Sequence, residues 1–290
     1  ASSDPQVAFP LALTIKRLEG DLKNELWLQL ASTASITPDV RAALLMGATD
    51  DRIGVIGNLA AASTDVASPL MLDLTQSVGL ANDTNECARV LAIVTGDSCP
   101  EAVRAALLTS LGRGLRRRGG SLVSLLDAEG VDESTRELVE RQFAQSAEVA
   151  ADADQPEVDR EAAIDLLADA SFDHAGDVLS ELLNPQTSQQ LQLAAIGALN
   201  QQSGDQPGKV LIENWESFSP QCRKAAVDAM LSQQTRTTEL LQAMTDAKVN
   251  PGDLEPADRQ LLLNHPDEGI REQATKVLGQ PASADRVSGG

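Results

Sequence analysis

Hydrophobic and polar positions recur along the chain with the spacing of amphipathic helices. Several segments share one form, in which a cap or turn precedes small residues and aliphatic residues follow at i, i+3, i+4 and i+7. These segments, with a weaker copy at residue 4, begin at residues 37, 99, 158, 191, 219 and 265: TPDVRAALLMG, CPEAVRAALLTSL, VDREAAIDLLAD, LQLAAIGALNQQ, SPQCRKAAVDAML and HPDEGIREQATKVL. Each predicts a helix whose apolar stripe packs on a neighbour.

The spacing of these helices indicates an internal repeat. The small-residue position recurs at Ala163, Ala195 and Ala226, at nearly constant intervals. The step from Ala43 to Ala106 is close to two such intervals. A regular period of about 30 to 45 residues, with two helices per unit, is typical of α-solenoids. In these proteins each unit buries its apolar face only against its neighbours. The predicted fold is therefore all-α, a HEAT-like right-handed α-α superhelix.

Helix starts carry their own signals. Proline fits the first helical position because its missing N–H would have no partner there and its φ is already suitable. We expect this position for Pro38, Pro100, Pro220 and Pro266, each preceded by a small or polar residue that serves as the cap. His265 is interpreted as such a cap.

Composition and patterning divide the chain into three regions. The sequence ADADQPEV loses the apolar periodicity and predicts a boundary between two subarrays near residues 150 to 157. We expect N-terminal helical repeats over residues 1–150 and C-terminal HEAT-like repeats over residues 151–280.

Residues 281–290, rich in Ser and Gly, are expected to form a flexible tail toward a further domain. Because the chain begins at Ala1 without Met, we also expect it to be a segment of a longer protein.

Composition excludes several classes of protein. The 290 residues hold 23 Lys and Arg against 43 Asp and Glu, a net charge of −20, and only 2% are aromatic. A β-sandwich or β-barrel needs more aromatic and β-branched side chains. Nucleic-acid binding needs surplus positive charge, so we expect no nucleic-acid partner. No apolar run reaches the roughly 18 residues that a membrane span requires, so we expect no membrane insertion.

The cysteines leave two alternatives open. Cys87, Cys99 and Cys222 are an odd set that cannot form a complete disulfide framework, so we expect them to pack as small apolar residues. The alternative is a bridge between Cys87 and Cys99 in an oxidising compartment. With no C-x-x-C or H-E-x-x-H pattern, the sequence predicts neither a metal site nor a cofactor.

Other polar groups are weak candidates for chemistry. The acidic residues between Asp152 and Glu161 resemble a cation-binding loop only loosely, and a solvated acidic segment explains them. His174 lies beside Asp173 and Asp177, yet no nucleophile is near it in sequence, so we expect no catalytic role. Trp27 and Trp215 are expected to fill gaps in the core. We therefore predict that the chain is not an enzyme.

One basic cluster lies on this acidic chain. It comprises Arg113, Arg116, Arg117 and Arg118, just before Gly119 and Gly120. Guanidinium groups pair bidentately with carboxylates, so the cluster is a possible partner-docking site. The alternative is a helix end, where cations oppose the negative end of the helix dipole and glycine terminates the helix.

The C-terminal half carries a family resemblance, over roughly residues 160 to 287. Its segments are LLNPQTSQQLQLAAIGALNQQ, VLIENWESFSPQCRKAAVDAMLSQQTRTTELLQAM and LEPADRQLLLNHPDEGIREQATKVLG. These segments resemble the HEAT-like region of large exported proteins of planctomycete-type bacteria. In that family a β-propeller resembling a dehydrogenase precedes the repeats and a c-type cytochrome domain follows them. The chain contains no C-x-x-C-H, so neither haem attachment nor dehydrogenase chemistry is carried over.

The resemblance implies a location outside the cytoplasm, periplasmic or otherwise exported. It also implies a non-catalytic scaffold, a spacer or docking module between redox domains. The alternative is a free-standing HEAT-like adaptor that binds a basic or helical protein partner along its concave face. Its negative charge would steer association, and salt would weaken the effect.

Overall fold

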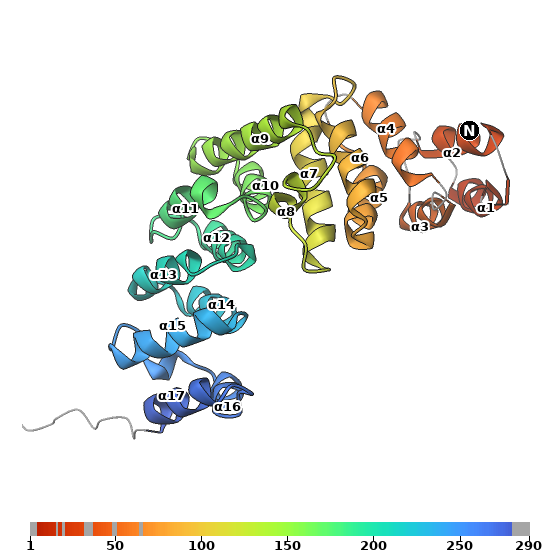
Figure 1. The fold of residues 1–290 in the computed structure, drawn as a ribbon. Helices are drawn as coiled ribbons and strands as arrows, with labels where there is room; N and C mark the ends of the chain where they lie inside the picture. Colours follow the sequence, from red (N-terminus) through yellow and green to blue (C-terminus); the bar gives the residue numbers. More distant parts are fainter. Residues whose placement is uncertain are drawn as a thin grey trace, which may run out of the picture. The chain divides into compact units, whose positions relative to one another are not determined.

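The chain is helical throughout the part that the structure describes. This computed structural model describes residues 5–15, 17–18, 21–31, 37–47, 51–63 and 66–279 (Figure 1). Within those ranges the backbone forms helices joined by turns, with no strand, which confirms the all-α prediction. The predicted tail, residues 281–290, lies outside the described residues.

Helix contacts divide the chain into two compact units, Ala1–Glu148 (unit 1) and Val149–Gly290 (unit 2). The division falls inside the helix α9 (Glu133–Ala151), whereas the sequence interpretation sets the domain boundary after residue 150. The link from α9 to the next helix spans residues 152–156 and contains the acidic, non-periodic segment.

Unit 1 is built from consecutive short helices. They are α1 (Pro5–Ile15), α2 (Asp21–Ala31), α3 (Pro38–Gly47), α4 (Arg52–Ala62), α5 (Pro69–Ala81), α6 (Thr84–Thr95), α7 (Glu101–Arg116), α8 (Leu122–Leu126) and most of α9. Each helix packs on the second one along the chain: α1 on α3, α3 on α5, α5 on α7, and likewise α2 on α4, α4 on α6 and α6 on α8.

Unit 2 continues with the same kind of packing. Its helices are α10 (Glu157–Leu167), α11 (Phe172–Glu181), α12 (Gln189–Gln201), α13 (Gln206–Glu213), α14 (Pro220–Leu231), α15 (Gln234–Thr245), α16 (Pro256–Leu263) and α17 (Glu268–Leu278), with single 3-10 turns at Trp215–Ser217 and Pro251–Asp253. Helices α10, α12 and α14 form one row, and α11, α13, α15 and α17 form a second row beside it (Figure 1).

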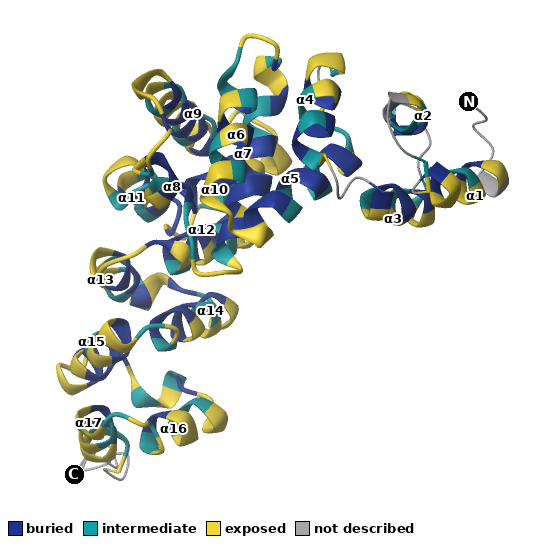
Figure 2. Cartoon of the chain, turned by 45° about the vertical axis from the view of Figure 1, so that its right-hand side comes forward, coloured by how far each residue is buried: buried dark blue, intermediate teal, exposed yellow. Residues whose placement is uncertain are grey.

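The buried positions of three successive helices in the first row coincide after a shift of one period. Helix α10 buries Ala163, Ile164, Leu166 and Leu167. The equivalent positions one period later are buried in α12: Ala195, Ile196, Ala198 and Leu199. Those a further period along the chain are buried in α14: Ala226, Val227, Ala229 and Met230. Figure 2 shows buried and exposed positions alternating along these helices.

Both tryptophans lie in the core, as predicted, each with 2% of its surface exposed. The indole N–H of Trp27 donates to the carbonyl oxygen of Leu44 at 3.1 Å. That of Trp215 donates to Oδ2 of Asp253 at 2.9 Å. Because each polar N–H has a partner, these large side chains fill the core without an unsatisfied donor.

The helix starts agree with the proline prediction at some positions and not at others. Pro38 and Pro220 are the first residues of α3 and α14, and Ser219 caps α14 by accepting from the Cys222 N–H at 3.2 Å. Pro100 is the residue just before α7. The prediction for Pro266 and His265 is wrong, because Asp267, a stronger cap than histidine, starts α17 by accepting from the Ile270 N–H at 3.0 Å.

Arginine side chains bond to carbonyl groups at helix ends. Nε of Arg136 donates to Leu126 O at 2.7 Å, at the end of α8. Nε of Arg160 donates to Ala150 O at 2.9 Å, at the end of α9. The last carbonyls of a helix lack hydrogen-bond partners within the helix and carry partial negative charge. A guanidinium group there supplies both a donor and a compensating positive charge. We call these contacts arginine caps.

The most enclosed arginine cap is Arg236, whose side chain is fully buried. Its Nη1 donates to Asn200 O at 3.3 Å, and its Nη2 donates to Gln202 O, both at the end of α12. The amide of Gln202 in turn donates to Leu167 O at 3.2 Å, at the end of α10. A hydrogen-bonded chain thus connects α10, α12 and α15.

Beside Arg236, the carboxylate of Glu239 is partly enclosed. Its Oε2 is buried and accepts no hydrogen bond within the described residues. Burial, and then the charge of Asp205, raise the pKa of Glu239, while Lys209 and Arg236 act in the opposite direction. The protonated form of this carboxyl is therefore favoured more in the native state than in the unfolded chain.

Two glycines bring the backbones of α5 and α7 into contact. A Cβ added at Gly114 would lie 2.2 Å from Gln76 O, and one added at Gly79 would lie 2.3 Å from Leu111 O. Both distances are far below van der Waals contact. The packing of α5 on α7 therefore requires glycine at both positions.

Among the described helices, none combines the length and the apolar character needed to cross a bilayer.

We predict that Gly114→Ala destabilises unit 1 by about 1–3 kcal/mol, because the added methyl group overpacks the α5–α7 contact. The matched control is Gly57→Ala in α4, where the added Cβ would meet Ile93 at an ordinary 3.5 Å. This control should be neutral or stabilising by up to about 1 kcal/mol through helix propensity. Urea unfolding followed by circular dichroism measures both, and equal midpoints would contradict the close approach.

We predict that Glu239→Gln raises the urea midpoint at pH 7. Because the pKa of Glu239 is higher in the native state than in the unfolded chain, the free energy of unfolding falls as the pH rises from the unfolded-state pKa through the native-state pKa. The variant and the parent should therefore converge below the ordinary glutamate pKa of about 4.3. Glu213→Gln, at an exposed position on α13, is the control for a lost negative charge. If Glu239→Gln had the same urea midpoint as the parent at pH 7 as well as below the glutamate pKa, the pKa shift would be contradicted.

Candidate functional site

The four arginines of the predicted docking site lie at one helix end in unit 1. Arg113 and Arg116 are in the last turn of α7, Arg117 is its C-cap residue, and Arg118 follows. The helix closes where Gly120 N donates to Leu115 O at 3.0 Å, beside Gly119 with its positive φ of 78°. This is the geometry of the helix-end alternative.

Within this cluster, Arg118 and Arg117 differ in their surroundings. Nε of Arg118 donates to Leu80 O at 3.2 Å and so joins the end of α5 to the end of α7. Arg117 is exposed. A docking role for the cluster stays a prediction, and Arg117 is the member whose substitution disturbs the described bonds least.

The other polar candidates lie at the surface. His174 is exposed, and its Nδ1 is 2.7 Å from Ser171 Oγ at the start of α11. Asp152 accepts from the backbone N–H of Asp154 and from the amide of Gln155, in that order of effect, which lowers the pKa of its carboxyl. Across the described residues, no three His, Cys, Asp or Glu side chains come together in a way that could hold a metal ion.

All three cysteine thiols are free and buried, so the packing interpretation is confirmed and the alternative of a bridge between Cys87 and Cys99 is wrong. Burial, followed by the charges of Asp83 and Glu86, raises the pKa of Cys87 to about 11. Burial also raises the pKa of Cys99. Since the thiolate is the nucleophile, both residues are poorly reactive in the native fold.

We predict that an aromatic disulfide reagent detects no thiol in the native protein at pH 8 and all three after unfolding in guanidinium. Burial blocks access, and the raised pKa of Cys87 lowers its thiolate fraction. Absorbance at the wavelength of the released thiolate gives the count. Fewer than three thiols in the unfolded, unreduced protein would indicate a disulfide and contradict the structure.

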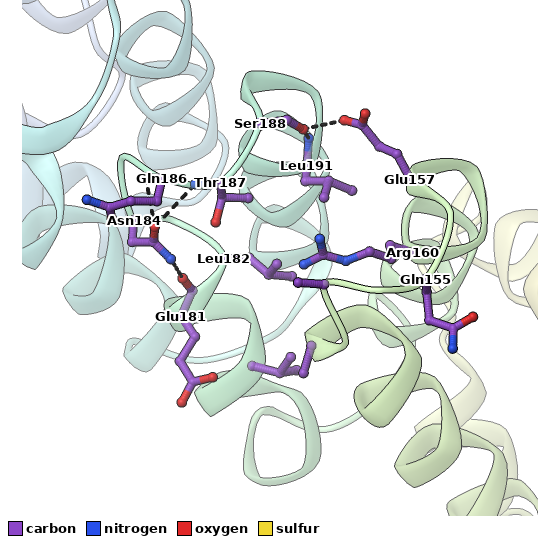
Figure 3. Close-up of a pocket in the computed structure, with 13 residues that line it drawn as sticks. Gln155, Glu157, Arg160, Glu181, Leu182, Asn184, Gln186, Thr187, Ser188 and Leu191 are labelled. Atoms are coloured by element: carbon purple, nitrogen blue, oxygen red, sulfur yellow. Dashed lines mark hydrogen bonds between the residues drawn. The ribbon is translucent and has the colours of Figure 1, made fainter.

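In unit 2 a cavity of about 460 Å³ opens where α10, α11 and α12 meet (Figure 3). Its apolar wall contains Val178, Leu182 and Leu191 together with two alanines, one at the end of α9 and one in the α9–α10 link. Leu182 and Leu191 are themselves almost fully buried. Polar and charged groups surround this wall, contributed by Gln155, Glu157, Arg160 and Glu181.

Arg160 reaches across the cavity. Its Nε is held by Ala150 O at 2.9 Å, and Figure 3 shows the guanidinium extended toward Leu182 and Leu191. The carboxylate of Glu157 is turned elsewhere, because it accepts a hydrogen bond from the Ser188 hydroxyl at the start of α12. Figure 3 shows no hydrogen bond between the two Nη atoms of Arg160 and the labelled residues around the cavity.

The loop on the far side of the cavity is held by Asn184. Its Oδ1 accepts from the backbone N–H groups of Gln186 and Thr187 at 2.8 and 3.2 Å. Its carbonyl oxygen accepts from the buried amide of Gln192 at 2.7 Å. The loop is thus fixed at both its tip and its base, so the cavity is formed in advance of any ligand.

The sequence interpretation missed this cavity. The sequence interpretation assigns no role to Arg160, and the lining residues come from three helix ends. No spacing motif marks such a set. The repeat gives no clear signal either, since the residue one period after Arg160 is the neutral Gln192 but the residue a further period on is Arg223.

A second, more open depression of about 510 Å³ lies on the row of α10, α12 and α14. Gln190 donates to Oε2 of Glu161 at 2.7 Å. Gln189 donates to Ser219 Oγ at 2.9 Å and to Gln221 Oε1 at 3.2 Å. These side chains bond to neighbouring helices, so this surface serves the stacking of the row.

No protein-family model, no curated protein and no solved structure matches this chain.

Proposed function

We propose that the chain is a non-catalytic helical-repeat scaffold with the architecture of a HEAT-like α-solenoid. Two helices make one unit, and the units stack through the two rows described for unit 2. Its role is to hold neighbouring domains or partners at a fixed distance. The mechanism is geometric, because a stack of repeats sets a length by the number of its units.

The observation that carries the proposal is the coincidence of buried positions in α10, α12 and α14 after successive shifts of one period. A globular helical domain has no reason to bury equivalent positions at a constant period. In a repeat array each unit faces the same neighbour in the same way, so the same positions are buried every time.

Side-chain bonds between units support the same proposal. Ser232 donates to Asn200 at 2.7 Å, and Gln234 donates to Asp267 at 2.9 Å, each across about one period of sequence. In unit 1, Arg41 and Asp73 pair at 3.0 Å, with a similar separation along the chain. Polar groups on one unit thus satisfy polar groups on the next.

The test is the removal of one period. Deleting residues 189–219 joins Ser188 to Pro220, and the cap Ser188 then stands where the equivalent cap Ser219 stood. We predict a soluble, helical protein that unfolds cooperatively with a moderately lower midpoint. Circular dichroism and urea unfolding provide the readout.

The control deletion removes α12 alone, residues 189–203, and therefore half a period. It should lose cooperative unfolding, because each later helix of unit 2 then faces the wrong neighbour. If both deletions unfold the protein equally, the helices are not equivalent units and the repeat proposal fails.

Within the scaffold proposal, the leading role is a spacer between redox domains of an exported protein with a c-type haem domain. Support comes from the resemblance of residues 160 to 287 to such repeats. The gene sequence on both sides of this segment decides between the roles. A signal peptide and a propeller upstream with C-x-x-C-H downstream support the spacer, and an open reading frame for this segment alone supports an adaptor.

The adaptor alternative is favoured by the distribution of charge. Several arginines bond to carbonyls at helix ends, and most of the described carboxylates are exposed on a chain with a net charge of −20. A basic helical partner would be attracted to such a surface, with an affinity that falls as salt rises. The arginine cluster at the end of α7 would then contact carboxylates of the same partner, and Arg117→Glu should weaken that contact.

A further inference from the structure

The cavity beside Arg160 has a property that stacking does not require. Arg160 and Gln192 occupy equivalent positions one period apart, and each bonds to a carbonyl of the segment before its helix: Ala150 O and Asn184 O. The neutral amide of Gln192 performs this role in the next repeat. The positive charge of Arg160 is therefore unnecessary for holding the backbone.

The guanidinium group of Arg160 points into the cavity. One edge of the group is fixed by the bond from Nε, and the Nη atoms extend into the cavity (Figure 3). A guanidinium edge presents two parallel N–H groups, which match the two oxygens of a carboxylate. The nearest acidic side chain on the same helix, Glu157, is bonded to Ser188 instead.

The surrounding residues restrict the ligand further. Glu157 and Glu181 lie on the rim, so a dianion such as phosphate would be repelled by two carboxylates while it gained one guanidinium. Val178 and the two alanines offer accessible aliphatic surface, with the almost fully buried Leu182 and Leu191 behind it. A volume of about 460 Å³ suits a small molecule or the last residue or two of a peptide.

We propose that this cavity binds an aliphatic monocarboxylate, with Arg160 recognising the carboxylate and the aliphatic wall of Val178 and the two alanines contacting the aliphatic group. The same chemistry is offered by the C-terminal leucine of a peptide and by a free branched-chain acid. The proposal goes beyond the scaffold role and does not depend on it, because the cavity lies within unit 2 whether or not the helices form a solenoid.

The experiment titrates the full chain with a fluorescent peptide that ends in Leu-Leu with a free carboxylate, with the same peptide amidated at its C-terminus, and, by calorimetry, with 4-methylpentanoate. We expect the free-carboxylate peptide or the free acid to bind, and the amidated peptide to bind at least about tenfold more weakly. Binding of the free acid alone identifies a small-molecule site, and binding of the peptide identifies a docking site.

The key variant is Arg160→Gln, which places in this repeat the residue that the next repeat already has. It should keep the thermal midpoint, because glutamine can bond to Ala150 O, yet weaken carboxylate binding about tenfold or more. Arg141→Gln, at an exposed position on α9, is the control for the same change in net charge and should bind as the parent does.

A second variant leaves Arg160 untouched. Ala153→Glu adds a negative charge at an exposed lining position and should also weaken binding. The proposal is overturned if neither carboxylate ligand binds, if the amidated peptide binds equally well, or if folded Arg160→Gln binds as tightly as Arg141→Gln.

Discussion

Short helices impose one constraint on this protein: the carbonyl groups at their ends need partners. An α-helix leaves its last four carbonyls unsatisfied, and short helices, such as α13 and α16, contain a large share of such groups. Side chains of later segments supply many of the partners. Because Arg236 and Gln202 reach helix ends about one period back in sequence, ending one helix and stacking the next depend on the same contacts.

This constraint also shapes the surface. Arg136 and Arg236, which bond to helix ends, are partly or wholly withdrawn from solvent, whereas most of the described carboxylates are exposed. The withdrawal of these arginines adds to the acidic character that 43 acidic against 23 basic residues already give the exterior. Arg160 is an exception within this pattern, because it bonds to a helix end with one nitrogen and still directs charge into an open space.

Much of the fold could be predicted from the sequence, since the apolar period is a local property of each helix. Helical class, the burial of both tryptophans and the cap Ser219 follow from residues within one turn of each other. The failure at Pro266 has a local cause as well, because two cap candidates, His265 and Asp267, lie close together and the better acceptor starts the helix.

The rest of the fold and the cavity could not be predicted because they depend on residues brought together from distant segments. The contact of Gly79 with Gly114 joins positions that the whole of α6 separates in sequence, and no motif relates them. The cavity needs three helix ends and one charged residue where the neighbouring unit has a neutral one.

The glycine pair between α5 and α7 has a consequence for how this sequence can change over time. Every single-nucleotide change that replaces a glycine codon with that of another amino acid introduces a side chain. At Gly79 or Gly114 the first atom of that side chain would meet a backbone carbonyl. Most positions of a helical array accept gradual drift among small and aliphatic residues, but these two do not, and two codons should stay fixed while their surroundings diverge.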